Sequence, residues 1–135
     1  MIDPDRVEAA LREYFRAAPD SVLCAWLFGS VGRGAPRDDS DVDVAVLYAE
    51  SPDDSWSEQL RLESELERRL RMRVQVVIAN RAPVDLLERA LRDGRLLLDR
   101  NTVRRAEFEL RVRREFFDLE PILRRYRTQR GSWDE

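Results

Sequence analysis

The sequence contains no histidine and a single cysteine among its 135 residues. Without histidine, the Ser-His-Asp triad, the Cys-His dyad and zinc sites built on histidine are excluded. The one cysteine, Cys24, lies in an apolar stretch, and we interpret it as a small buried hydrophobe rather than a nucleophile. Any catalysis must therefore rest on carboxylates, hydroxyls and arginines.

Long apolar runs are also absent, and none approaches the roughly 20 residues needed to span a bilayer. The first residues lack the basic and then apolar segments of a secretion signal. With 43% hydrophobic and 38% charged residues, the chain is too apolar to be disordered. We expect one domain over residues 1–130, a flexible tail at 131–135, no membrane contact and a cytoplasmic location.

Lysine is missing as well, so that all 24 basic residues are arginine. Residues 1–60 hold 13 acids and 5 arginines, whereas residues 61–135 hold 14 acids and 19 arginines. The acidic first part suits a metal site. The arginines of the second part alternate with glutamates at helical spacing, which favours a solvated helix face over a surface for nucleic acid.

Helices and strands are expected to alternate along the chain. Short apolar runs that end at glycine or at polar segments predict buried strands, and apolar positions that recur every three or four residues predict helices. The expected strands span 22–28, 42–48, 74–78 and, at a sheet edge, 95–99; the expected helices span 4–17, 55–71, 84–93 and 101–129. This order predicts an α/β (α+β) fold with a small mixed sheet of three or four strands, flanking helices and a C-terminal helical extension.

Local signals predict how several helices begin and end. Ser55 and Glu58 match a capping box, and Asn101 is expected to cap the last helix. Gly94 is expected to end a helix in the left-handed conformation. Pro121 is expected to kink or interrupt the last helix.

The segment between the first two strands carries a candidate phosphate site. Gly29 follows a buried strand, where the lack of a side chain permits a tight turn and the close approach of a ligand. Ser30 offers a hydroxyl and a backbone N–H to phosphate oxygens, and Arg33 follows within reach of the same anion. We interpret these three residues as a phosphate cradle.

Asp41 and Asp43 form a candidate metal site. They are separated by one residue, so that both side chains project from the same face of the expected strand. Carboxylate oxygens are preferred ligands of Mg²⁺, and a metal there would orient a triphosphate and help deprotonate an incoming hydroxyl. The alternative is a solvated acidic turn, because Asp-x-Asp after a glycine loop also arises by chance.

The order of these motifs resembles a known signature. Gly29-Ser30, then Arg33-Gly34, then Ser40-Asp41-Val42-Asp43 before an apolar strand is similar to the signature of the DNA polymerase β-like nucleotidyltransferase superfamily. More narrowly, the chain resembles the minimal nucleotidyltransferase (MNT) antitoxins of the MntA type, the partners of HEPN-domain toxins. The resemblance extends over nearly the whole chain and includes Asn80-Arg81-Ala82-Pro83, Gly94-Arg95-Leu96-Leu97, Phe117-Asp118-Leu119-Glu120-Pro121 and Leu123-Arg124-Arg125-Tyr126.

This resemblance implies a nucleotidyltransferase fold and the activity of a protein adenylyltransferase: transfer of AMP from ATP, with Mg²⁺, to a tyrosine hydroxyl of a HEPN toxin, which silences the toxin. It also implies site residues by position. Metal binding and catalysis fall to Asp41 and Asp43, and nucleotide binding falls to Gly29, Ser30, Arg33 and Ser40.

One position departs from the superfamily pattern. A third carboxylate is expected on the next strand, and the matching residue is Gln75. Its amide has no charge and cannot act as a general base for the attacking hydroxyl. Two alternatives therefore stand beside the enzyme: a catalytically impaired domain that neutralises a toxin by binding only, and a nucleotidyltransferase for a small molecule, for which so short a chain leaves little room.

The expected C-terminal helix carries two apolar stripes. Val103, Leu110 and Phe117 recur on one side, while Phe108 and Val112 lie elsewhere on the helix. One stripe is expected to join the core. The other is expected to bind the toxin or a second copy of the chain, with deeper burial of the whole helix as the alternative.

Overall fold

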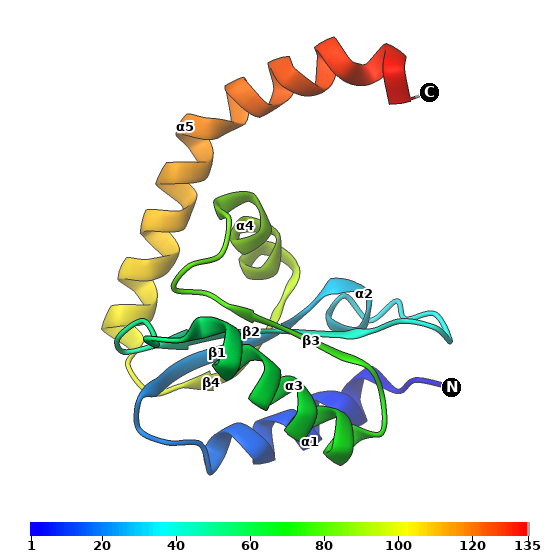
Figure 1. Cartoon of the computed structure of the whole chain (residues 1–135), viewed down its shortest axis with the longest axis vertical. Helices are drawn as coiled ribbons and strands as arrows, with labels where there is room; N and C mark the ends of the chain where they lie inside the picture. The colour runs from blue at the N-terminus through cyan, green and yellow to red at the C-terminus, as the bar shows by residue number, and fades with distance from the viewer. Residues whose placement is uncertain (135) are drawn as a thin grey trace.

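The computed structural model describes the backbone of residues 1–134 and the side chains of residues 1–128. In chain order the elements are α1 (Pro4–Arg16), β1 (Val22–Phe28), α2 (Gly29–Gly32), β2 (Val42–Tyr48), α3 (Ser55–Leu70), β3 (Val74–Ile78), α4 (Val84–Asp93), β4 (Arg95–Asp99) and α5 (Thr102–Asp134). The predicted fold class is confirmed, because helices flank a mixed sheet that has four strands in the described part of the chain (Figure 1).

The strands are arranged in the order β3-β2-β1-β4. β1 runs antiparallel to both of its neighbours, whereas β2 and β3 are parallel and are connected through α3. All seven residues of β1 are buried, as its unbroken apolar run predicts for a central strand. The sheet therefore needs cover on both faces.

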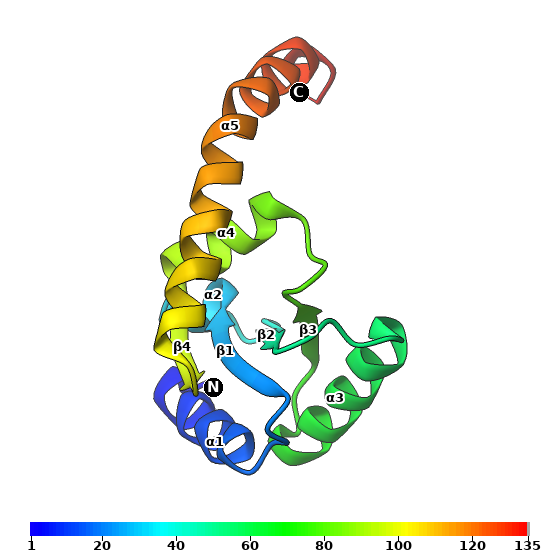
Figure 2. The same cartoon turned by 90° about the vertical axis from the view of Figure 1, so that its left-hand side faces the viewer.

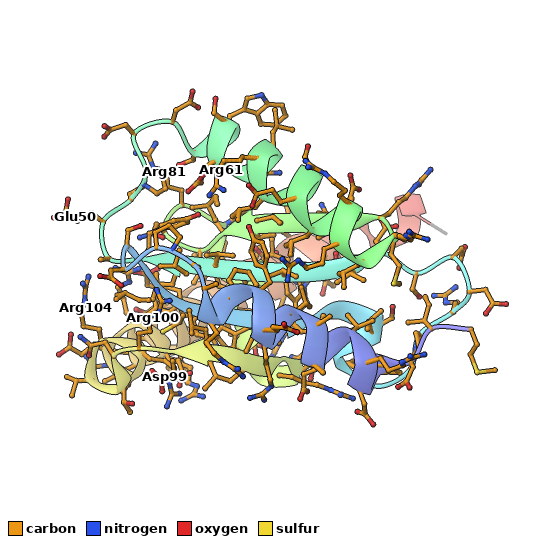
Figure 3. All side chains as sticks on the ribbon, turned by 90° about the horizontal axis from the view of Figure 1, so that it is seen from below. Glu50, Arg61, Arg81, Asp99, Arg100 and Arg104 are labelled. Atoms are coloured by element: carbon orange, nitrogen blue, oxygen red, sulfur yellow. The ribbon has the colours of Figure 1, made fainter. Side chains whose placement is uncertain are left out.

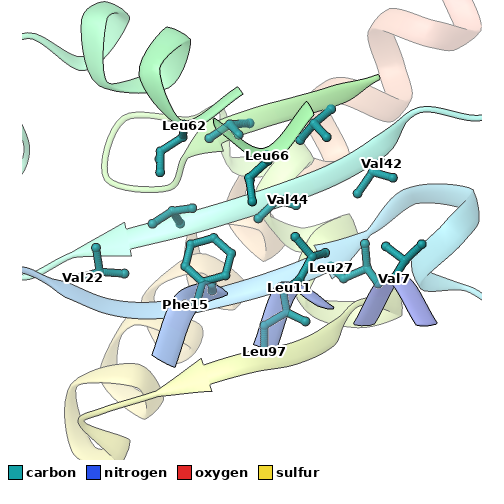
Figure 4. Close-up of a cluster of buried hydrophobic side chains, with 14 of the residues drawn as sticks. Val7, Leu11, Phe15, Val22, Leu27, Val42, Val44, Leu62, Leu66 and Leu97 are labelled. Atoms are coloured by element: carbon teal, nitrogen blue, oxygen red, sulfur yellow. The ribbon is translucent and has the colours of Figure 1, made fainter. Parts of the chain in front are cut away.

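Helices α1 and α3 cover one face of the sheet, and α4 with the first part of α5 covers the other (Figures 1 and 2). Alternate residues of β2 divide between these faces, because side chains along a strand point to opposite sides. Phe15, Leu66 and Val44 belong to the cluster under α1 and α3 (Figure 4). Ala45 of β2 belongs to the cluster under α4 and α5.

The cluster under α4 and α5 contains Cys24. Its side chain is fully buried, and burial raises the pKa of the thiol to about 11. The thiol is therefore protonated at neutral pH and unreactive, which confirms its interpretation as a hydrophobe. Phe108 and Val112 of α5 are buried in the same cluster, and Phe108 packs beside Trp26 with ring centroids 5.9 Å apart.

Two of the predicted helix ends are wrong. Asp54, not Ser55, caps α3: its carboxylate accepts hydrogen bonds from the backbone N–H of Ser57 at 3.0 Å and from the Ser57 hydroxyl at 2.7 Å. Gly94 is extended, with φ −82° and ψ 162°, rather than left-handed. Glycine is required there by space, because a Cβ would lie 2.2 Å from the carbonyl oxygen of Ala90.

Helix α5 begins as predicted but continues further. The Asn101 side chain accepts a hydrogen bond from the backbone N–H of Arg104 at 3.0 Å, which confirms the cap. The helix runs to Asp134 instead of ending near residue 129, and it bends in its orange stretch, where Pro121 lies (Figure 1). The flexibility expected for 131–135 stays a prediction, and Glu135 lies outside the described residues.

Arg100 links the C-terminal end of α1 to the sheet through hydrogen bonds. It directly follows β4, and Figure 3 shows it beside Asp99. Its guanidinium donates hydrogen bonds to the backbone carbonyls of Phe15, Arg16, Ala18, Pro19 and Val22. These carbonyls include the open C-terminal end of α1, which has no further helical partners. Among the described helices, none is both long enough and apolar enough to cross a membrane.

Candidate functional site

The candidate site lies at one end of the sheet, where β1 ends and where β2 and β3 begin. Phe28 pairs with Asp43 across β1 and β2, and Asp43 pairs with Gln75 across β2 and β3. Neighbouring strands are separated by about 4.8 Å, so that Phe28, Asp43 and Gln75 lie side by side on three adjacent strands, and Gly29 follows directly after Phe28. The fold thus brings motif residues together with Gln75, which stands at the position expected for the third carboxylate.

A pocket of about 230 Å³ opens between this end of the sheet and α4. Aspartates and arginines share it with apolar side chains. Its lining consists of Phe28, Gly29, Arg33, Asp43, Gln75, Val77, Leu86, Arg89 and Asp93. The pocket therefore combines an apolar floor with a few charged groups, the usual composition of a small-ligand site.

Gly29 makes the close approach expected of it. Its φ is +70°, in the left-handed region, and a Cβ at this position would lie 2.1 Å from Oδ2 of Asp43. Only glycine lets the chain turn away from β1 while the Asp43 carboxylate stays at the pocket. The space that a Cβ would fill lies directly beside a carboxylate oxygen, where a metal or phosphate can approach.

The Asp43 carboxyl is electrostatically strained. Its pKa is raised to about 6. Burial is the largest cause, the charge of Asp41 adds to it, and the charge of Arg33 partly offsets both. Asp41 lies one residue before β2 rather than on the strand, which corrects the predicted placement of the pair. The two carboxylates are still close enough to repel, and a cation between them would relieve that repulsion.

Ser30 and Ser40 do not line the pocket but are hydrogen-bonded to each other across the segment that connects β1 to β2. The hydroxyl of Ser30 donates to that of Ser40 at 2.9 Å, and the Ser40 hydroxyl also accepts from the backbone N–H of Arg37 at 2.7 Å. Ser40 and Asp41 border a neighbouring hollow that Arg73 also lines. The two serines therefore join the turn after β1 to the residues just before β2.

Arg33 and Arg95 act on the same turn in different ways. Arg33 lines the pocket, and its charge lowers the pKa of Asp43 and, after the larger effect of the hydrogen bond from Arg92, that of Asp93. Arg95 donates from Nε to the carbonyl oxygen of Gly32 at 2.9 Å. It thereby fixes the short helix α2 against β4, leaving Arg33 free to face the pocket.

The donor set at this site suits Mg²⁺ bound together with a phosphate. Among the described residues, no three side chains of His, Cys, Asp or Glu are grouped to hold a metal by themselves. Magnesium is commonly held by one or two carboxylates with the remaining positions taken by water and substrate phosphates. Asp41 and Asp43 can supply the carboxylates, and Gln75 lines the same pocket as Asp43.

Five pocket residues were missed from the sequence: Phe28 and Val77 on strands β1 and β3, and three residues on α4. Leu86, Arg89 and Asp93 follow one another at i, i+3 and i+7, which places them on one helix face. That spacing could have grouped them. The spacing could not have placed these residues beside Asp43, because the position of α4 depends on its packing against side chains of β1.

Comparison with known proteins gives a family match and several structural matches. The family model for polymerase beta nucleotidyltransferases matches residues 10–103, which is most of the chain and includes every residue of the pocket. No curated protein sequence matches the chain significantly.

Solved structures with the same fold include chains of toxin-antitoxin complexes. One such complex contains AMP-PNP; the match has 21% identity, covers 93% of each chain and has a TM-score of 0.68. Another contains a tri-AMPylated HEPN toxin of Shewanella oneidensis with an MNT antitoxin; the match has 18% identity, covers 96% of this chain and 94% of the other, and has a TM-score of 0.65. A third structure, provisionally described as a minimal nucleotidyltransferase, has 33% identity over 70% of this chain and 95% of its own, with a TM-score of 0.51.

Proposed function

The chain belongs to the polymerase beta nucleotidyltransferase family, and we propose that it is the antitoxin of a HEPN/MNT toxin-antitoxin pair that transfers AMP from ATP to a tyrosine hydroxyl of its toxin. The observation that carries this proposal is the close approach of Gly29 to Asp43 within the charged pocket. Support comes from similar folds in toxin-antitoxin complexes, one with AMP-PNP and one with an AMPylated toxin.

Each residue of the motif has a role in this proposal. Asp41 and Asp43 hold Mg²⁺, and Gly29 gives the nucleotide access to that metal because a side chain there would collide with Asp43. Arg33 contacts the phosphates from the turn that follows β1. Ser30 and Ser40, through their mutual hydrogen bond, set the shape of that turn and offer it to the nucleotide.

The reaction exchanges one phosphorus–oxygen bond for another. The tyrosine oxygen bonds to the α-phosphorus, the bond from that phosphorus to the bridging oxygen breaks, and pyrophosphate leaves. Mg²⁺, when bound, neutralises the triphosphate and lowers the pKa of the incoming hydroxyl. The hydroxyl proton passes to water, because Gln75 has no charge with which to accept it.

A second function is favoured by Gln75 itself. This residue is exposed in the pocket at the row beside Asp43, where a third carboxylate would stand. The loss of a positioned general base typically lowers a rate by about 10²- to 10⁴-fold. In this alternative the chain binds nucleotide but neutralises its toxin by contact alone.

The surface proposed for the toxin is the exposed apolar side of α5. Phe108 and Val112 are buried in the core, whereas Val103, Leu110 and Phe117 are exposed, so that the two stripes predicted from the sequence face different environments. Ile122 and Tyr126 are exposed further along the same helix. Deeper burial of the whole helix is therefore wrong, and the exposed side is available to a partner.

The decisive experiment is intact-mass spectrometry of a HEPN toxin that forms a complex with this chain, after incubation with ATP and Mg²⁺. We expect the toxin to gain one or more AMP units, and the gain to vanish with Asp41→Ala/Asp43→Ala. A neutralised toxin of unchanged mass would replace the enzyme with the binding-only antitoxin. A chain that neither binds Mg-ATP nor associates with a HEPN toxin would refute both.

A further inference from the structure

Helix α4 forms the wall of the pocket that faces the sheet end. Leu87 and Ala90 on its inner side are buried against β1, which fixes the helix in place. This leaves the face that carries Leu86, Arg89 and Asp93 over the row of Gly29, Asp43 and Gln75. A ligand that binds at Asp43 in this pocket therefore also contacts side chains of α4.

The two pocket arginines have no partners of their own within the described part of the chain. The guanidinium groups of Arg33 and Arg89 form neither a hydrogen bond nor an ion pair there. The other charged residue of α4 in the pocket, Asp93, is already paired, because Arg92 bonds both of its carboxylate oxygens at 3.2 Å. Arg89 is thus a cation that borders the pocket without a fixed counter-charge.

Gln75 is the reason that strand β3 offers Arg89 no counter-charge. It lines the pocket together with Arg89, and a carboxylate in its place would offer Arg89 an ion pair. The neutral amide leaves the guanidinium available. An arginine that lines the same pocket as Asp43 and keeps its five N–H donors unused suits an anion with several oxygens, and a phosphate is the group that the guanidinium fork matches best.

We propose that Arg89 is a phosphate-binding residue of this site, which binds the triphosphate of the nucleotide at the sheet end together with Arg33. The proposal rests on the proposed function, because it assumes that a nucleotide occupies the pocket. It goes beyond the motif between Gly29 and Asp43, since Arg89 lies on a separate helix and far along the sequence. The site would then take one arginine from the end of α2, where Arg33 is the C-cap residue, and the other from α4.

The test measures Mg-ATP binding by isothermal titration calorimetry, without any toxin. Loss of a hydrogen bond between charged groups predicts that Arg89→Gln weakens binding about ten- to a hundredfold. Arg89→Lys keeps the charge but loses the fork, so it should fall between Arg89→Gln and the unaltered protein. Because Arg89 is exposed, neither variant should change the thermal unfolding midpoint by more than a small amount.

Arg12→Gln is the matched control for the loss of one positive charge. Arg12 is an exposed arginine of α1, on the opposite face of the sheet, and it pairs with Glu8. Its variant should bind Mg-ATP as the unaltered protein does. Equal binding by Arg89→Gln and the unaltered protein, or equal weakening by Arg89→Gln and Arg12→Gln, would overturn the proposal.

A transfer assay with the toxin separates the two possible sources of the anion. If Arg89 instead binds an acidic group of the acceptor protein, Arg89→Gln will raise the KM for the toxin while the affinity for Mg-ATP stays unchanged, and the proposal is wrong. If the unaltered protein itself fails to bind Mg-ATP, the proposed function fails first. The two failures are therefore distinguishable.

Discussion

The two faces of the sheet differ in what their side chains do. Under α1 and α3, Leu11, Phe15 and Leu66 are fully buried and form a continuous apolar core. Under α4 and α5 the apolar cluster gives way, toward the sheet end, to the pocket beside Asp43. Both faces bury apolar side chains, but only the face under α4 and α5 also carries charged groups at a pocket, and the partial burial of such groups costs stability.

The largest expected effect lies on the face under α1 and α3. Phe15→Ala removes a fully buried ring and should lower the free energy of unfolding by about 3–5 kcal/mol. Urea unfolding monitored by circular dichroism measures this loss. Phe15→Leu keeps much of the volume and should cost less than about 1.5 kcal/mol.

The same pair of variants tests whether the two faces are separate. Folded Phe15→Leu should bind Mg-ATP with unchanged affinity, because α1 does not reach the pocket. A large loss of nucleotide affinity in Phe15→Leu would show that the core under α1 also shapes the site, and the division between the faces would fail.

A smaller effect of opposite sign is expected at Asp43. Its pKa is raised to about 6 in the folded protein, from an ordinary value of 3.8. Below pH 3.8 the carboxyl is protonated in both states and contributes nothing; between pH 3.8 and 6 the folded state holds the proton more tightly, so that stability falls as pH rises. Above pH 6 the full cost remains.

Asp43→Asn should remove this cost. Without metal, the variant should gain on the order of 1–2 kcal/mol of stability relative to the unaltered protein between pH 4 and pH 7, as measured by urea unfolding at both values, because solvent screens part of the charge of this partly exposed carboxyl. It should also lose Mg-ATP binding. A pH-independent difference between the two proteins would contradict the raised pKa, and Asp39→Asn, in the exposed loop, is the matched control.

The sequence predicted the strands well because their signals are local. The bounds of β1, β2, β3 and β4 agree with the expected runs, since each is apolar or β-branched and ends at polar residues or glycine. The turn at Gly29 was also predictable, because a glycine directly after a buried strand indicates a backbone conformation that residues with a Cβ rarely adopt. These features depend on neighbours in the chain.

What the sequence could not predict depends on packing between distant segments. Nothing local indicates that α4 carries Arg89 over Asp43, or that Gly94 is glycine for lack of space beside Ala90. The two stripes of α5 were visible from their spacing, yet which one is buried is decided by contact with Trp26 of β1. The missed parts of the site are the ones that a second element contributes.

The smallest effect on stability, with the largest on assembly, is expected at Phe117. Its side chain is 76% exposed on α5, so that Phe117→Ala should change the free energy of unfolding by less than about 0.5 kcal/mol. If this side of α5 binds the toxin, truncating an aromatic there should weaken the complex by about 2 kcal/mol or more, which is at least about thirtyfold in Kd. Biolayer interferometry with the toxin measures this change in Kd.

The matched control is Trp56 of α3. It is 66% exposed on the opposite side of the sheet, and Trp56→Ala should leave the complex unchanged. Equal binding by both variants would place the toxin elsewhere and leave the exposed stripe of α5 unexplained, whereas a loss confined to Phe117→Ala would place toxin docking on the same side of the sheet as the pocket.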